Sequence, residues 1–135
     1  QLNEISLSRN DEIKTLPQTS LVHLSKLVQV EISGSRVRHR MPLEMQLPAG
    51  LQTLDLSGND FGDTAIIPNS WDNLSELNYL DLSNCSLSDF FDAHGFLGKR
   101  KKLEVLRLSA NNLTRVPENL FRLRLRTLDL GYNQI

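Results

Sequence analysis

Hydrophobic positions recur along the chain in a short pattern that is clearest over residues 51–61, which read LQTLDLSGNDF. Residues 54–56 alternate between apolar and polar as a β-strand does, but the alternation lasts only a few residues. Residues 58–60, Gly-Asn-Asp, then favour a turn, after which Phe61 points back to the interior. A unit this short buries too little apolar surface to fold alone, so the pattern predicts that similar units stack beside it.

Six copies of this unit follow one another, with 22 to 26 residues between successive starts. They begin at Leu2, Leu27, Leu51, Leu77, Leu103 and Leu125. Neighbouring strands of a sheet lie about 4.8 Å apart, so leucines at equivalent positions would form continuous columns. The pattern therefore predicts that Leu54, Leu80 and Leu106 lie side by side on adjacent strands. Each fully buried leucine would contribute roughly 1.5–3 kcal/mol.

The copies read LNEISLSRN, LVQVEISGS, LQTLDLSGN, LNYLDLSNC, LEVLRLSAN and LRTLDLGYN. They resemble the leucine-rich repeat family, whose pattern is LxxLxLxxNxL, and the resemblance covers essentially the whole chain. It implies an α/β fold, a curved horseshoe segment of a solenoid with one short parallel strand per repeat and an irregular or short helical back. We expect residues 1–135 to form a single array of about six repeats. Because neither end carries an atypical capping repeat, we also expect the chain to be an excerpt of a longer array.

The asparagine position of the repeat is expected to form a structural ladder. Its occupants are Asn10, Ser35, Asn59, Cys85, Asn111 and Asn133. An inward asparagine there can bond backbone groups left free where the strand turns away, and so join neighbouring repeats. Ser35 and Cys85 are small enough to fit but bond less well, which predicts a weaker ladder in the second and fourth repeats. Cys85 is expected to be buried in this ladder, and a reactive or metal-bound thiol is the alternative.

The segments between the strands are expected to return the chain across the back without long helices. Pro17, Pro68 and Pro117 stand at similar places in three of these segments, and proline disfavours a helix interior. Residues 37–47 and 87–102 depart from the pattern, so both are expected to bulge. Irregular repeat lengths and proline-containing backs resemble those of extracellular receptors, including Toll-like ones.

The composition fits one folded domain. The chain has 135 residues, of which 39% are apolar and 23% charged, enough to build a core. Its apolar runs are far too short to cross a bilayer, and no signal peptide is recognisable. A single cysteine rules out an internal disulfide and a multi-cysteine metal site. The net charge of −1 combines −7 over residues 1–98 with +6 over residues 99–135.

No catalytic motif is recognisable in the sequence. HExxH, GxSxG, Walker and GxGxxG motifs are absent, and the three histidines stand in different back segments. We therefore expect neither an enzyme nor a cofactor or metal. An enzyme whose catalytic domain lies outside this chain is the remaining alternative.

The concave strand face is the candidate site, because alternation turns the residues between the inward leucines outward. Stacked like charges repel, so three adjacent acids in one column could mark a docking face for a basic or polar partner. We favour the alternative, that Leu-Asp-Leu-Ser is simply the family's common strand. Aromatic residues anchor interfaces, which makes Tyr79 the preferred contact. The predicted partner-binding residues are Tyr79, Asp81, Asp55, Glu31, Arg107, Asp129 and Tyr132.

Two basic clusters could bind phosphate-rich or heparin-like ligands, but we favour solvated loop charge. They are Arg36, Arg38, His39 and Arg40, and Lys99, Arg100, Lys101 and Lys102, with Arg122, Arg124 and Arg126 adding to the second. Nucleic-acid binding would require aromatic residues between the basic ones, and we do not expect it. The phenylalanines before Lys99 look like core residues of the back.

Three Asn-x-Ser/Thr triplets, at Asn73, Asn84 and Asn112, are possible glycosylation sites if the chain is secreted. Together these features predict a protein-binding recognition module in a receptor ectodomain at the cell surface, with a protein or glycan ligand on its concave face. An intracellular, cytoplasmic scaffold or regulatory subunit built from the same repeats is the alternative. Any membrane attachment would come only through regions absent from this chain.

Overall fold

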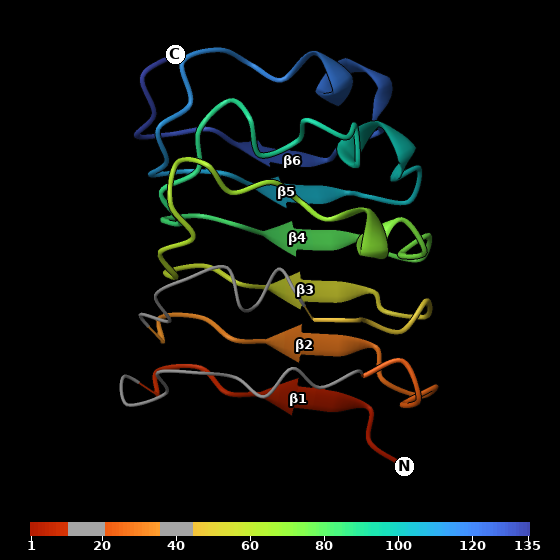
Figure 1. The fold of residues 1–135 in the computed structure, drawn as a ribbon. Helices are drawn as coiled ribbons and strands as arrows, with labels where there is room; N and C mark the ends of the chain where they lie inside the picture. The colour runs from red at the N-terminus through yellow and green to blue at the C-terminus, as the bar shows by residue number, and fades with distance from the viewer. Residues whose placement is uncertain (11–20, 36–44) are drawn as a thin grey trace.

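The chain forms a solenoid in which six parallel strands make one sheet, ordered as in the sequence (Figure 1). The strands are β1 (Glu4–Ser6), β2 (Gln29–Glu31), β3 (Thr53–Asp55), β4 (Tyr79–Asp81), β5 (Val105–Arg107) and β6 (Thr127–Asp129). This computed structural model describes residues 1–10, 21–35 and 45–135. Pro17 and the basic cluster at residues 36–40 lie outside the described residues. The predicted fold, one short parallel strand per repeat with an irregular back, is confirmed.

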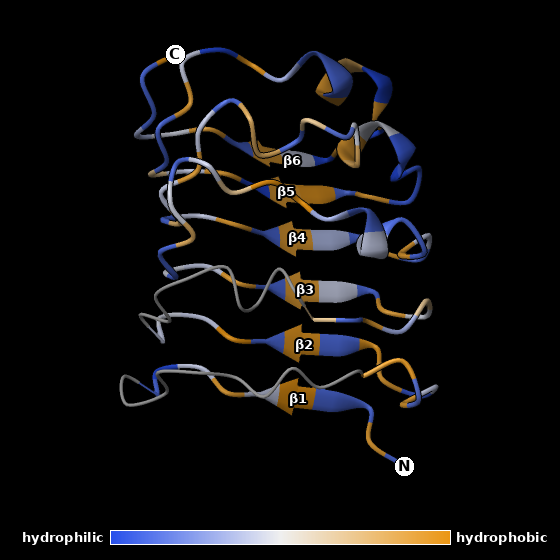
Figure 2. Cartoon of the chain, in the orientation of Figure 1, coloured by the Kyte–Doolittle hydropathy of each residue, from blue (hydrophilic) through white to orange (hydrophobic). Residues whose placement is uncertain are grey.

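The predicted leucine column is present. Leu54 pairs with Leu80, and Leu80 pairs with Leu106, at the centres of adjacent strands. All three side chains are fully buried. Figure 2 shows the result as a hydrophobic band that crosses the middle of each strand. The column therefore fixes the register of the whole sheet, because a slip by one residue would expose it.

The described part of the back contains short 3₁₀ helices and no α-helix. The helices are η2 (Asn69–Trp71), η3 (Leu97–Lys99) and η4 (Glu118–Arg122). Pro68 and Pro117 directly precede η2 and η4. Proline is suited to a helix start, since it lacks the N–H that would stay unbonded there.

Aromatic residues fill the space between the strands and the back. Trp71 and Phe96 are buried and meet edge to face, with ring centroids 6.2 Å apart. The Trp71 Nε1–H donates to the Met45 carbonyl at 3.0 Å. The expectation of a core role is wrong for Phe90, which is 67% exposed, because its neighbour Phe91 occupies the inward position.

The expectation that the basic run at residues 99–102 is solvated loop charge is wrong for Arg100, which is buried. Its guanidinium lies 4.6 Å from the centroid of the Phe96 ring and donates to the carbonyls of Trp71 and Asp72. Burial lowers the pKa of Arg100, but arginine remains charged at any physiological pH. Arg100 therefore joins the backs of the third and fourth repeats.

Asn111 shows how the asparagine ladder joins the repeats. Its Nδ2 donates to the carbonyls of Leu82 and Leu108, both at 2.9 Å, and its Oδ1 accepts from the N–H groups of Cys85 and Leu87 at 3.0 Å. Both polar atoms of one side chain thus bridge two neighbouring repeats. Such bonds matter because, without them, buried backbone groups would have no hydrogen-bond partner.

The other asparagines of the ladder make related bonds. Asn59 and Asn133 each donate to a carbonyl of their own repeat and one of the preceding repeat. Asn10, in the first repeat, donates to the Leu7 carbonyl at 2.9 Å.

Ser35 and Cys85 retain only part of this ladder. The Ser35 hydroxyl donates to the Leu7 carbonyl at 3.1 Å, and the Cys85 thiol donates to the Leu56 carbonyl at 3.2 Å. Neither side chain has a carbonyl oxygen that could replace the Oδ1 of asparagine. Burial raises the pKa of the Cys85 thiol to about 12, so the thiol stays protonated at neutral pH. Cys85 thus lies buried at its ladder position.

The residue before each ladder position has a left-handed backbone. The values of φ at these positions lie between 53° and 72°, at Arg9, Gly34, Gly58, Asn84, Ala110 and Tyr132. Only glycine adopts this conformation without strain, whereas other residues pay roughly 1–2 kcal/mol. The turn that aims the ladder side chain inward therefore requires strain in four of the six repeats.

Replacing Asn111 by alanine should lower the free energy of unfolding by about 3 kcal/mol, because two N–H groups and two carbonyls lose a buried partner. The measurement is urea unfolding followed by circular dichroism. Asn112→Ala is the matched control, since this neighbour is exposed, and it should cost less than about 0.5 kcal/mol. Equal losses of unfolding free energy in the two variants would show that the ladder bonds of Asn111 do not stabilise the fold.

Candidate functional site

The solvent-facing side of the sheet, predicted above as the concave face and here called the strand face, carries the predicted contact residues. It consists of the outward residues at three positions on or just after each of the six strands. Five of them are acidic and one is basic, which gives a net charge of −4. These charged residues are Glu4, Glu31, Asp55, Asp81, Asp129 and Arg107.

The predicted charged column is present in the register of the sheet. Glu31 pairs with Asp55, Asp55 with Asp81, Asp81 with Arg107, and Arg107 with Asp129. Because adjacent carboxylates repel one another, each acid in this column requires a compensating partner. The structure shows what those partners are.

Asp81 is only 6% exposed, although the sequence predicts it as a contact residue. Its Oδ1 accepts from the Ser83 N–H at 2.9 Å. Its Oδ2 lies 3.4 Å from the Tyr79 hydroxyl and 3.9 Å from Nη1 of Arg107. These neighbours cover most of the carboxylate, so direct contact between Asp81 and a partner stays a prediction.

Two other aspartates of the column make the same local bond. The Oδ1 of Asp55 accepts from the N–H and hydroxyl of Ser57, at 2.9 and 2.7 Å. The Oδ1 of Asp129 accepts from the Gly131 N–H at 3.0 Å. An aspartate that bonds the backbone two residues ahead stabilises a turn. The Asp-Leu-Ser and Asp-Leu-Gly spacings of the sequence therefore have a structural reason, which is this turn bond.

Tyr79 and Arg107 form the mixed aromatic and cationic patch of the strand face. The Arg107 guanidinium lies 5.8 Å from the centroid of the Tyr79 ring, within range of a cation–π interaction. The Arg107 side chain is 47% exposed, and Tyr79 is half-buried. Burial, and secondarily the Asp81 charge, raises the pKa of Tyr79, so its hydroxyl remains a hydrogen-bond donor. Tyrosine and arginine are typical anchors of protein interfaces.

The remaining predicted contacts lie apart from this patch. Glu31 accepts a bond from the Gln29 amide at 2.9 Å, and the same amide donates to Glu4 at 3.1 Å. Tyr132 is 91% exposed but belongs to the left-handed turn after β6, at the edge of the strand face. Tyr132 and Tyr79 therefore occupy different positions in their repeats: Tyr79 lies on a strand and Tyr132 in the turn after one.

All three candidate glycosylation asparagines are exposed. The Asn73 amide donates to the Leu47 carbonyl at 3.0 Å. Asn84 lies in the left-handed turn after β4, beside the strand face. Asn112 directly follows the buried ladder residue Asn111. Glycosylation at these positions stays a prediction.

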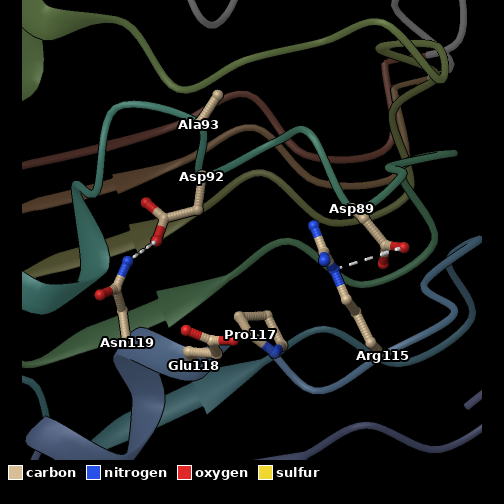
Figure 3. Close-up of a pocket in the computed structure, with 7 residues that line it drawn as sticks. All are labelled: Asp89, Asp92, Ala93, Arg115, Pro117, Glu118 and Asn119. Carbon is tan, nitrogen blue, oxygen red and sulfur yellow. Dashed lines mark hydrogen bonds and ion pairs between the residues drawn. The ribbon is translucent and has the colours of Figure 1, made fainter.

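A hollow of about 260 Å³ lies on the back between the fourth and fifth repeats (Figure 3). Asp89 accepts from the Thr114 N–H and hydroxyl, and these bonds lower its pKa. Asp92 accepts from the Leu97 N–H and the Asn119 amide, and burial raises its pKa. Both aspartates already have hydrogen-bond partners, so we interpret the hollow as a contact between repeats rather than a ligand site.

Within the described residues, no group of three or more His, Cys, Asp or Glu side chains could hold a metal ion. In the same part of the chain, no helix is long and apolar enough to cross a membrane.

Models for leucine-rich repeats match residues 51–68, 76–96 and 102–123. The chain belongs to the leucine-rich repeat family. Such repeats are protein-interaction modules, which supports a general role in protein binding for this chain.

A human protein, "Leucine-rich repeats and immunoglobulin-like domains protein 3", is 27% identical over 135 residues. The match covers 99% of this chain but 11% of the human protein. This leucine-rich repeat chain therefore spans only a small part of that relative's length.

Two solved structures from Arabidopsis thaliana are also similar. One is the ectodomain of the plant membrane receptor kinase GASSHO1/SCHENGEN3 in complex with CASPARIAN STRIP INTEGRITY FACTOR 2. It has 32% identity and a TM-score of 0.80, and the match covers 98% of this chain and 16% of the ectodomain. The other is the BIR3–SERK2 complex, with 26% identity and a TM-score of 0.59, where the match covers 87% of this chain and 66% of the other.

Replacing Asp81 by alanine should lower the free energy of unfolding by about 1–2 kcal/mol, because the Ser83 N–H loses its acceptor. Asp81→Asn should cost less than half as much, since the amide oxygen can still accept that bond. Thermal and urea unfolding measure both variants. An unchanged unfolding free energy in Asp81→Ala would mean that the carboxylate is a free surface group.

Proposed function

We propose that this leucine-rich repeat chain is a recognition segment of a receptor ectodomain, which binds a protein or glycan ligand on its strand face. The ligand contacts the patch formed by Tyr79 and Arg107. The chain itself performs no catalysis. Its location is extracellular or at the cell surface.

The observation that carries this proposal is the contrast between Tyr79 with Arg107 and the rest of the strand face. The neighbouring aspartates satisfy backbone groups of their own turns. Arg107 keeps nearly half of its side chain accessible and lies beside the only aromatic ring of the strand positions. An aromatic ring beside a half-exposed guanidinium gives a partner both apolar contact and a charged hydrogen-bond donor.

The similar proteins support the receptor part of the proposal. The GASSHO1/SCHENGEN3 structure is named as the ectodomain of a membrane receptor kinase in complex with CASPARIAN STRIP INTEGRITY FACTOR 2. The BIR3–SERK2 structure is likewise a complex. Because this chain spans only a fraction of these proteins, their partners and signalling roles are analogies for it.

A photo-crosslinking amino acid at position 79 should form a covalent adduct with the ligand in the protein's native cells. Benzoyl-phenylalanine is suitable because it replaces one aromatic side chain by another. Position 121 is the matched control, since Phe121 is 81% exposed but belongs to η4 on the back. Mass spectrometry should detect one discrete adduct from position 79 and none from position 121. Adducts from position 121 alone would place the binding surface on the back.

Glycosylation separates the receptor proposal from the alternative of an intracellular scaffold. Native protein should lose mass on treatment with an N-glycosidase, because Asn84 and Asn112 are exposed in Asn-x-Ser/Thr triplets. The combined Asn73→Gln, Asn84→Gln and Asn112→Gln variant should show no such shift over this segment. Unmodified asparagines at all three positions in native material would favour the intracellular scaffold.

A further inference from the structure

A second hollow, of about 530 Å³, lies where the chain enters strands β4, β5 and β6. We call it the basic hollow. Four cationic and two anionic side chains line it, which leaves two positive charges in excess. These residues are Lys101, Lys102, Arg124, Arg126, Glu76 and Glu104.

The excess charge belongs to two particular residues. Nζ of Lys102 lies 2.6 Å from Oε2 of Glu76, and Nε of Arg126 lies 3.4 Å from Oε2 of Glu104. Nζ of Lys101 bonds only the Gly98 carbonyl, at 3.1 Å, among the described groups. Within the described residues no carboxylate pairs with Lys101 or Arg124. Both cations are exposed and available to a partner.

The fold explains why these cations meet at the edge of the strand face. Lys101 and Lys102 end the back of the fourth repeat, directly before Leu103 begins the fifth. Arg126 precedes β6, and its N–H donates at 2.8 Å to the carbonyl of Glu104, which directly precedes β5. Arg107, the last residue of β5, lies three residues after Glu104. With about 3.3 Å per residue, a ligand that reaches from Arg107 to the basic hollow spans roughly 10 Å.

We propose that the basic hollow binds an acidic segment of a polypeptide partner. Its carboxylates pair with Arg124 and Lys101 while the rest of the partner lies on the strand face. This inference rests on the proposed function, because it names the chemistry of the ligand. Arginine is suited to this role, since its planar guanidinium can bind both oxygens of a carboxylate.

The lining favours an acidic peptide over a sulfated glycan. Glu76 and Glu104 would repel a polymer that carries a sulfate on nearly every sugar. A peptide can place one or two carboxylates on the free cations and bond the amides of Gln52 and Asn78, which also line the hollow, through its backbone.

Charge on the strand face also orients such a partner. Glu4, Glu31 and Asp55 on β1 to β3 have no cation paired with them among the described residues. An acidic segment is repelled from that end and attracted to the other. The partner therefore docks with its acidic segment at the β5–β6 end.

The test uses a fluorescein-labelled decapeptide of alternating glutamate and glycine, and measures fluorescence anisotropy at low ionic strength. Arg124→Glu should weaken binding by about tenfold, because attraction becomes repulsion at short range. Arg122→Glu is the matched control, since it changes the net charge equally but lies in η4 and does not line the hollow. Arg122→Glu should weaken binding by less than about twofold. Circular dichroism checks that both variants are folded.

Equal losses in Arg124→Glu and Arg122→Glu would overturn the inference, because they would indicate a general charge effect. Tighter binding of a heparin-derived oligosaccharide, with the same dependence on Arg124, would also overturn it in favour of a glycan. Loss of the adduct at position 79 is a different result and would overturn the proposed function. If Arg124→Glu leaves peptide binding unchanged while the adduct at position 79 is retained, only the proposed role of the basic hollow is rejected.

Discussion

Hydrogen bonds from the ladder side chains to carbonyls of the preceding repeat are the interaction on which this structure depends. Each strand has only three residues, so the ladder side chains add bonds between repeats just beyond the strand ends. Asn59 reaches the Ile32 carbonyl, Asn111 reaches Leu82 and Asn133 reaches Leu108. Because these bonds satisfy backbone groups that would otherwise be unpaired, they reinforce the register that the leucine column also fixes. The strand face depends on the same register.

The sequence predicted this architecture well because its information is local and repeated. The spacing of Leu54, Leu80 and Leu106 was sufficient to predict their alignment on adjacent strands. The ladder positions were recognisable for the same reason. A solenoid repeats one local structure, so six copies of a short sequence motif, each weak evidence alone, together identify the fold.

The sequence failed where a residue's environment comes from the neighbouring repeat. Arg100 reads as part of a solvated basic run, but Phe96 and the carbonyls of Trp71 and Asp72 bury it. Asp81 reads as an exposed acid, but Tyr79, Ser83 and Arg107 surround it. The long-range partners, Trp71 and Asp72 for Arg100 and Arg107 for Asp81, lie 26 to 29 residues away on an adjacent turn and leave no mark in a local pattern. The same limit applies to the basic hollow, whose cations come from separate repeats.

The left-handed turn after each strand has a consequence for how such arrays diversify. A glycine there can be exchanged for a side chain at a modest energetic cost, and that side chain then decorates the edge of the array while the core stays unchanged. Asn84 and Tyr132 are displayed in this way. The freedom ends where two glycines stack, because a methyl group on Gly58 would lie 3.0 Å from the backbone of Gly34. Variation at this edge is therefore governed by the adjacent turn, and a bulky residue requires more room on the coil beside it.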